Sequence, residues 1–124
     1  MKTLTMSSIP KTWLIDIDGV IFVHNSYLRE DGDTLLPDIQ VVFSQISNED
    51  CIILLTSRTI QYYDTTIKSL KKFNIKFNHI IFGLPFGERI LINDKKLSNL
   101  KTAFAVNTLR DNPGIIRVIR DPLL

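Results

Sequence analysis

The sequence predicts an α/β domain with a central, mostly parallel sheet. Four short runs of large apolar residues, at 13–22, 51–55, 79–82 and 89–92, are typical of strands buried inside a domain. Patterns with helical periodicity separate the first three runs, and the order strand, helix, strand is typical of parallel strands. Three of the four runs also end in polar side chains, which indicates a site at one edge of the sheet.

Length and charge narrow the classes of protein to consider. A chain of 124 residues indicates one domain, which we expect to span residues 1–124. The net charge is only +2 and no block of like charge occurs, so the sequence indicates neither disorder nor nucleic-acid binding. No apolar run is long enough to span a bilayer, and residues 1–11 lack the apolar core of a signal peptide. We therefore expect a cytoplasmic protein with no membrane partner.

The first apolar run, Trp13–Phe22, predicts a strand buried on both faces that ends in two carboxylates. Asp16 and Asp18 are two positions apart, so a strand would project both to the same side, and we expect the chain to turn at Gly19. Carboxylates this close repel each other, and a bound cation offsets that repulsion most easily. The alternative is a simple strand-end turn, because Asp-Gly is a common turn dipeptide.

A polar, turn-rich segment follows, and we expect it to form a flap over about residues 20–36. Its first part, 20–28, is expected to form a short hairpin above the strand ends. Its side chains His24, Asn25 and Tyr27 then either cover part of a bound ligand or belong to a purely structural hairpin.

The next segment predicts a helix and a second strand. Pro37 suits the first turn of a helix that we expect to end near Asn48, because apolar residues recur at the helical period at Ile39, Val42, Phe43 and Ile46. The run Cys51–Leu55 then predicts a second buried strand, parallel to the first. Residues 56–58 would therefore arrive beside the two carboxylates.

Further elements are expected downstream, namely a helix over 59–74 and strands over 79–82, 89–92 and 103–106. The strand 89–92 would end in Asn93 and Asp94. Residues 115–119 predict either a short strand or a helix.

Three strand ends should thus meet at one edge of the sheet, carrying Asp16 with Asp18, Thr56 with Ser57, and Asn93 with Asp94. Carboxylates with few basic neighbours favour a hard, oxygen-ligated ion, and Mg²⁺ is the usual one where a substrate carries phosphate. A carboxylate can also attack phosphorus, in a reaction that needs charge neutralisation, a hydroxyl donor and an acid for the leaving group. The set therefore predicts a site for a small phosphorylated substrate.

These residues resemble the motifs of the haloacid dehalogenase-like (HAD) superfamily of aspartate-nucleophile phosphatases. Its first motif, an apolar strand followed by Asp-x-Asp-Gly-Thr/Val, matches residues 16–20. Its second, an apolar strand ending in Thr or Ser, matches 51–56, and its fourth, an apolar strand ending in acids, matches 89–94. The resemblance covers roughly residues 12–106 and implies a Rossmann-like three-layer sandwich. The stretches between the motifs are too short for the cap domain that many relatives insert, so it implies a capless member.

The resemblance implies a Mg²⁺-dependent phosphatase that works through an aspartyl phosphate. Asp16 would be the nucleophile and a Mg²⁺ ligand. Asp18 would be the general acid and base, with its main-chain carbonyl on the metal. Asp94 would hold the metal directly or through water, and Asn93 is a further candidate ligand.

The same resemblance implies a phosphate-binding group at the end of the second strand. Thr56 would bind the phosphoryl group through its hydroxyl, with the main-chain amides of Ile17 and Ser57. Arg58 would either reach the substrate phosphate or cap the second helix.

Two departures from the family pattern bear on activity. Many relatives have an acid where this chain has Asn93, so we expect a lower affinity for Mg²⁺. Relatives also place a lysine, commonly in a Lys-Pro pair, where this chain has Leu84-Pro85. Arg89, Lys95 or a lysine of the second helix would have to replace it. The alternative that follows is a catalytically degenerate member that serves as a binding or regulatory protein.

The sequence does not identify the substrate. Capless relatives have open sites, which serve larger substrates or borrow cover from a neighbouring subunit. The resemblance is therefore compatible with a homo-oligomer. The stretch 83–96, with 100–103 after it, is similar to small bacterial members linked with surface-polysaccharide biosynthesis, which suggests a phosphosugar or a nucleotide-linked sugar. A receiver-type phosphoacceptor domain also uses Asp at strand ends, but it carries its acidic pair and its phosphoacceptor on different strands.

Overall fold

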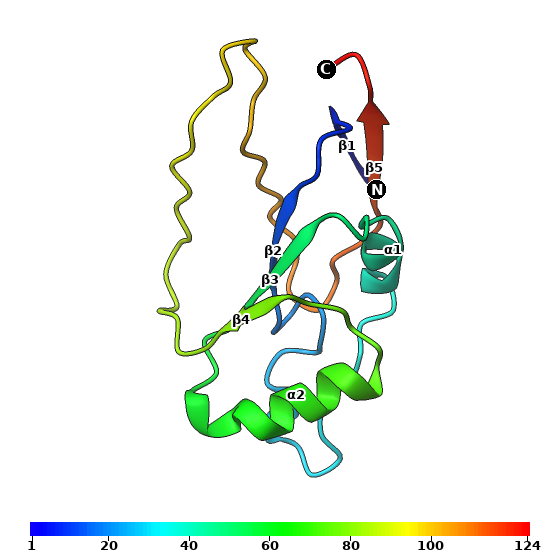
Figure 1. The fold of residues 1–124 in the computed structure, drawn as a ribbon. Helices are drawn as coiled ribbons and strands as arrows, with labels where there is room; N and C mark the ends of the chain where they lie inside the picture. The colour runs from blue at the N-terminus through cyan, green and yellow to red at the C-terminus, as the bar shows by residue number, and fades with distance from the viewer.

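Two separate parallel sheets and two α-helices form the regular structure of this chain. The computed structural model describes residues 1–124 and shows a small α/β fold (Figure 1). The strands are β1 (Lys2–Ser7), β2 (Thr12–Asp16), β3 (Cys51–Leu55), β4 (His79–Ile81) and β5 (Ile116–Asp121). The helices are α1 (Ile39–Ser44) and α2 (Tyr63–Lys72), with short 3₁₀ turns η1 (Ser26–Leu28) and η2 (Ile60–Tyr62).

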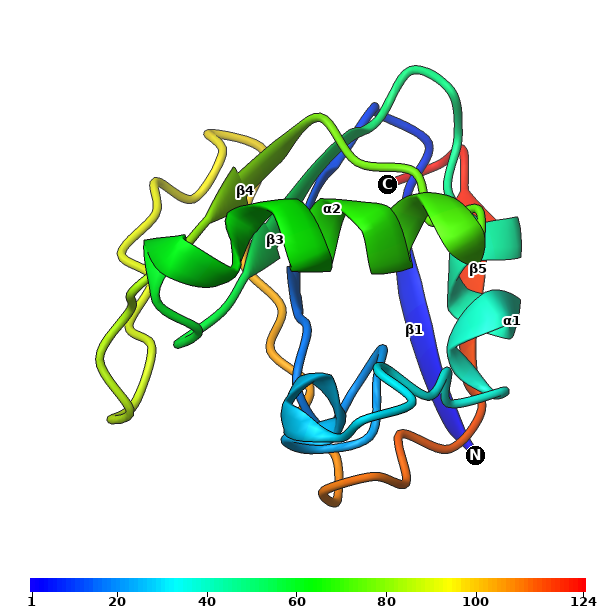
Figure 2. The same cartoon turned by 90° about the horizontal axis from the view of Figure 1, so that it is seen from below.

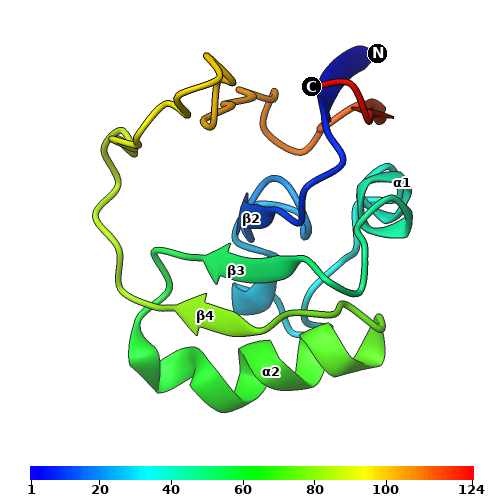
Figure 3. The same ribbon diagram turned by 45° about the horizontal axis from the view of Figure 1, so that its top comes forward.

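The larger sheet has the order β2-β3-β4, and all three strands are parallel. Asp16 lies opposite Leu55, and Leu55 lies opposite Ile81, so the three strands end together at one edge. Figure 3 shows β3 and β4 side by side with α2 along them. The prediction of parallel strands linked by helices is confirmed for this part of the chain, and β3 has the predicted bounds.

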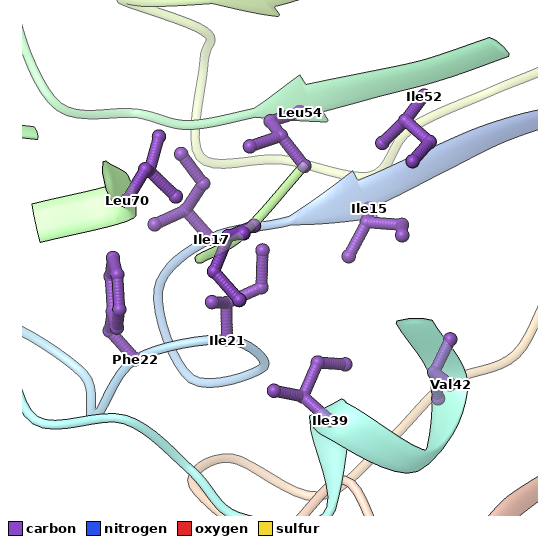
Figure 4. Packing of buried hydrophobic residues seen from close by; sticks show 10 residues of the cluster. Ile15, Ile17, Ile21, Phe22, Ile39, Val42, Ile52, Leu54 and Leu70 are labelled. Atoms are coloured by element: carbon purple, nitrogen blue, oxygen red, sulfur yellow. The ribbon is translucent and has the colours of Figure 1, made fainter. Parts of the chain in front are cut away.

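Helix α2 covers one face of this sheet (Figures 2 and 3). Its inner side buries Thr66 and Leu70, whereas Lys71 and Lys72 lie in the last turn, where they suit the helix dipole. The core that joins helices and sheet consists mainly of branched aliphatic side chains, and nine of its residues are labelled in Figure 4: Ile15, Ile17, Ile21, Phe22, Ile39, Val42, Ile52, Leu54 and Leu70. Tight packing of this cluster holds the ends of β2 and β3 rigidly.

The second sheet pairs β1 with β5 in parallel, and α1 lies next to β5. The link is Gln45, whose Nε2 donates to the Ile116 carbonyl at 2.7 Å and whose Oε1 accepts from the Val118 amide at 2.8 Å. The side-chain amide therefore pairs with the edge of β5 as a neighbouring strand would.

The structure corrects the extent of two predicted elements. The first strand ends at Asp16 rather than Phe22, because residues 17–22 form a tight turn. Its burial on both faces was also wrong, because β2 is an edge strand and Leu14 is 48% exposed. Helix α1 is shorter than predicted over 37–48, because its ends tighten into i−3 bonds such as Gln40 to Pro37.

The strands predicted over 89–92 and 103–106 are absent. Residues 83–107 form a long excursion without helix or strand, which Figure 1 shows in yellow-green to orange at the side of the molecule. Ile90 and Ile92 are 84% and 93% exposed. An apolar run becomes a strand only when a neighbouring edge accepts its backbone hydrogen bonds, and no strand pairs with this one.

Residues 116–121 form a strand, which settles the choice left open for 115–119. Strand β1 was not predicted, although Leu4 and Met6 alternate with polar Thr3 and Thr5 at the period of two that marks a strand. No helix has the length and apolar character that a bilayer crossing requires.

Candidate active site

A tight turn after β2 places the two aspartates. The Ile17 carbonyl accepts from the amides of Ile21 and Phe22 at 2.9 and 3.0 Å, and the Gly19 amide donates to the Phe22 carbonyl at 2.7 Å. Gly19 has φ of +84°, a conformation that glycine adopts without strain, so the turn expected here is confirmed. Asp16 therefore ends the strand, and Asp18 lies inside the turn.

The Asp16 carboxylate is half-buried and remains accessible, with 39% of its side chain exposed. Partial burial raises the pKa of this carboxyl, Arg89 acts in the opposite direction, and the charge of Asp18 raises the pKa further. Arg89 Nη2 lies 3.9 Å from Asp16 Oδ1. Of the cations proposed to replace the family lysine, Arg89 is therefore the one that the structure brings to Asp16.

The Asp18 carboxylate is fixed by two neighbours from the end of β3. Its Oδ2 accepts from the Thr56 hydroxyl at 3.0 Å. Its Oδ1 accepts from Nε and Nη2 of Arg58 at 3.1 and 2.9 Å. The Thr56 oxygen also accepts from the Arg58 amide at 3.0 Å, and Thr56 is fully buried. One carboxylate is thus accessible while its neighbour is held by charge-assisted hydrogen bonds.

Arg58 is buried, with none of its side chain exposed, and lies between two carboxylates. Besides Asp18, it donates to Asp33 from Nη1 at 3.1 Å and Nη2 at 2.8 Å, and to the Thr66 hydroxyl at 3.0 Å. Burial alone lowers the pKa of Arg58, but the hydrogen bonds to Asp33 and Asp18 outweigh burial and raise it. A guanidinium has five N–H donors, and these bonds use all of them.

Hydrogen bonds hold the flap predicted over 20–36 in place at both of its ends and at its centre. The Val23 amide donates to the Thr34 carbonyl at 2.9 Å, and the Leu36 amide donates to the Ile21 carbonyl at 2.8 Å. Between these pairs, the buried Ser26 hydroxyl donates to Asp33 at 2.9 Å. The flap therefore pairs 21–23 with 34–36, rather than forming the hairpin expected within 20–28.

Two aromatic residues lie near the Arg58 cluster. The Tyr27 ring has the Arg58 guanidinium 4.2 Å from its centroid, within the range of a cation–π contact. Tyr62 meets Tyr27 edge-on at 4.8 Å between centroids. Near the flap's start, the His24 amide donates to Asp111 at 2.7 Å, which ties the flap to the C-terminal part of the chain.

The remaining predicted site residues lie in two different parts of the structure, some at the strand ends and some in the long excursion. Ser57 is half-buried beside Thr56, and the Ile17 amide donates to the Leu55 carbonyl at 2.9 Å within the sheet ladder. Asn93 and Asp94 are exposed in the long excursion, where both bond Thr102. No group of three or more His, Cys, Asp or Glu side chains gathers in a metal-binding arrangement. The structure thus brings the first two strand ends together but not the predicted third.

Sequence reasoning missed the part played by Asp33. The run Asp31-Gly32-Asp33 carries no periodicity that distinguishes its two acids, yet Asp33 is buried against Arg58 and Asp31 is exposed. A buried arginine needs hydrogen-bond acceptors for all five of its N–H donors, so it needs a second partner besides Asp18. That requirement is the only signal for a contact with the flap. A hollow lined by Asp50 and Asn78 lies at the opposite end of the strands, so it is separate from this site.

No protein-family model matches this chain, and neither a curated protein nor a solved structure matches it.

Proposed function

We propose that this chain is a phosphomonoester hydrolase that works through an aspartyl phosphate on Asp16. The observation that carries the proposal is an accessible carboxylate at the end of a parallel strand with the Arg89 guanidinium beside it. A carboxylate can attack phosphorus only if the charge of the phosphate is compensated, and a guanidinium matches phosphate oxygens well. Arg89 supplies that charge where the family pattern has lost its lysine at Leu84.

The reaction proceeds in two displacements. In the first, an oxygen of Asp16 forms a bond to phosphorus, the ester P–O bond breaks, and Asp18, which is protonated at the start of the cycle, gives its proton to the departing oxygen. In the second, Asp18 takes a proton from water, the water oxygen bonds to phosphorus, and the bond to Asp16 breaks to release phosphate. Thr56 and Arg58 hold the Asp18 carboxylate for both steps. Ser57 is the proposed neighbour of the phosphoryl group, because Thr56 is fully buried and its hydroxyl is bonded to Asp18.

Mg²⁺ belongs to the proposal as the implied cofactor, and it would neutralise charge on the phosphoryl oxygens. The residues present supply only part of a ligand set, because Asp16 is accessible while Asp94 and Asn93 lie in the exposed excursion. Mg²⁺ is often held by one or two carboxylates with water and substrate oxygens. Asp16 is the residue that would hold it.

We also propose a Rossmann-like three-layer fold without a cap domain. α2 on one face of a parallel sheet and α1 packed into the same core support this arrangement. The proposed substrate is a small phosphorylated compound such as a phosphosugar, on the resemblance of residues 83–96 to small bacterial members. We also propose a cytoplasmic location without nucleic-acid partners, and a homo-oligomer as a further source of cover.

A second candidate is a binding or regulatory protein that retains this site without turnover. The observation that favours it is the engagement of the Asp18 carboxylate by Thr56 and Arg58, together with the separate position of Asp94. Such a protein would bind a phosphorylated ligand at Asp16 and Arg89 and release no phosphate.

The deciding experiment measures release of inorganic phosphate from a panel of phosphosugars and nucleotides, with Mg²⁺ and with a chelator. Wild type is compared with Asp16→Asn and with Asp64→Asn, a matched substitution at an exposed site on α2. Turnover that is lost in Asp16→Asn and kept in Asp64→Asn supports the hydrolase. Equal inactivity of all three folded proteins, with ligand binding retained by wild type and by Asp64→Asn, supports the second candidate.

A further inference from the structure

The Arg58 side chain joins two segments that are far apart along the chain. One edge of its guanidinium holds Asp18 in the turn after β2, and the other holds Asp33 in the flap. Asp33 and Arg58 both have fully buried side chains, so this pair is shielded from water. Buried charges are stable only when paired and fully hydrogen-bonded, and removal of one partner leaves the other uncompensated.

The shape of the guanidinium couples the two carboxylates geometrically. Nη2 donates to both, at 2.9 Å to Asp18 and 2.8 Å to Asp33. Because the group is planar and all five donors are used, neither carboxylate can shift without displacing the other or breaking a bond. A lysine has the charge but not the fork, so it cannot hold both carboxylates in this way.

The Asp33 contact lies at the centre of the flap. The Ser26 hydroxyl donates to Asp33 and accepts from the Thr34 amide at 3.2 Å, so one bond network joins both limbs of the flap to Arg58. Tyr27 stacks over the same guanidinium. The flap thus has an ionic attachment to the site in addition to the backbone pairs at its ends.

We propose that Arg58 is a positioning residue that latches the flap to the candidate site, through Asp33, and thereby fixes the carboxylate of Asp18. The latch is independent of any activity. Its effect on catalysis rests on the proposed function, because it assumes that Asp18 protonates the leaving group.

The first test is hydrogen exchange, which needs no substrate. Asp33→Asn is compared with Asp31→Asn, the same substitution at an exposed position of the same flap. In Asp33→Asn the amides of Val23 and Leu36 should exchange about tenfold faster relative to that of Ile52, which bonds Asn78 at the far end of the sheet. Asp31→Asn should leave the ratio unchanged. Equal ratios in the two variants would overturn the latch.

Two further variants keep the test decisive if Asp33→Asn does not fold. Ser26→Ala retains every charge and removes one bond to Asp33, so it should speed exchange of the same amides to a smaller extent. Arg58→Lys retains the charge without the fork, and it should behave like the loss of Asp33. Unchanged flap exchange in both variants would contradict the proposal.

The second test separates positioning from a merely structural role by the leaving group. Asp33→Asn should lower kcat/KM, which reports the first displacement only, by about tenfold or more for a phosphosugar, whose alkoxide leaving group needs a proton. It should change kcat/KM for p-nitrophenyl phosphate, whose leaving group needs none, by less than about twofold. Equal losses would refute the positioning role. If wild type turns over neither compound, the proposed function fails and the exchange ratios alone decide the latch.

Discussion

Nη2 of Arg89 lies 3.9 Å from Oδ1 of Asp16, although Arg89 belongs to a segment without helix or strand. Both side chains are 39% exposed, so the pair adds little to stability, about 0–1 kcal/mol. Its significance is chemical, because it places a guanidinium beside the carboxylate that is proposed to attack phosphorus.

Removal of that guanidinium should reduce activity far more than stability. In Arg89→Gln we expect kcat/KM for phosphate release to fall by about a hundredfold, because one charge contact to the developing negative charge is lost. Steady-state kinetics measures this, and thermal unfolding should be nearly unchanged. Lys95→Gln, at the other cation considered for this part of the chain, is the control. Equal losses of kcat/KM in the two variants would show that Arg89 contributes no more to the reaction than Lys95 does.

Neutralisation of Asp16 should stabilise the fold at neutral pH. Because partial burial raises the pKa of Asp16 in the folded state, the folded protein retains the proton more strongly, and stability falls as pH rises above the ordinary pKa of 3.8. Asp16→Asn removes this loss, by less than about 1 kcal/mol after screening by solvent. Urea unfolding at pH 3 and pH 7 should show a gain only at pH 7. A loss of stability at pH 7 would contradict this expectation.

Asp50 should contribute stability of the opposite pH dependence. Burial alone raises its pKa, but hydrogen bonds from Trp13 and from the Lys11 and Ser47 amides outweigh burial, so the pKa lies below its usual value. Asp50→Asn should destabilise the protein by about 2–3 kcal/mol at pH 7. The difference should shrink as pH falls from the ordinary pKa of 3.8 through the lower pKa of the folded protein, where the wild-type carboxyl takes up its proton. Urea unfolding at pH 7 and pH 3 measures these differences. Glu49→Gln, at the exposed neighbouring position, should unfold like wild type at both pH values.

Gly19 should resist substitution because of its backbone conformation. Its φ is +84°, and an added Cβ would lie 3.4 Å from Cγ of Arg110. Gly19→Ala should therefore lower the free energy of unfolding by about 1–2 kcal/mol. Gly87→Ala is the matched control, because no atom lies within 4 Å of its added Cβ. Similar urea midpoints for the two variants would argue against strain at Gly19.

The sequence predicted those elements whose signal is local. Cys51–Leu55 is a continuous apolar run between turn residues, and it is a strand with those bounds. The second helix shows a clear apolar stripe, and its predicted span over 59–74 contains η2 and α2. The failures depend on pairing: residues 89–92 have equally good strand propensity, but an edge partner decides whether they pair, and a short run does not encode it.

The candidate site also combines contacts that the sequence predicted with contacts that it did not. The ends of β2 and β3 are adjacent in the sheet, so the proximity of Asp18 and Thr56 followed from strand order. The partnership of Arg58 with Asp33 depends on how a long loop folds back, and loop composition alone does not specify it. The position of Asp94 depends on the strand at 89–92, which does not form.

The pairing of β1 with β5 has a consequence for how this chain acquires its structure. Lys2 lies opposite Ile116, and β1 has no other partner strand. During synthesis the β1 segment therefore emerges before β5 and stays unpaired until β5 has left the ribosome. Contacts of such high sequence separation form slowly, so we expect the second sheet to assemble last, after β2, β3 and β4 have joined.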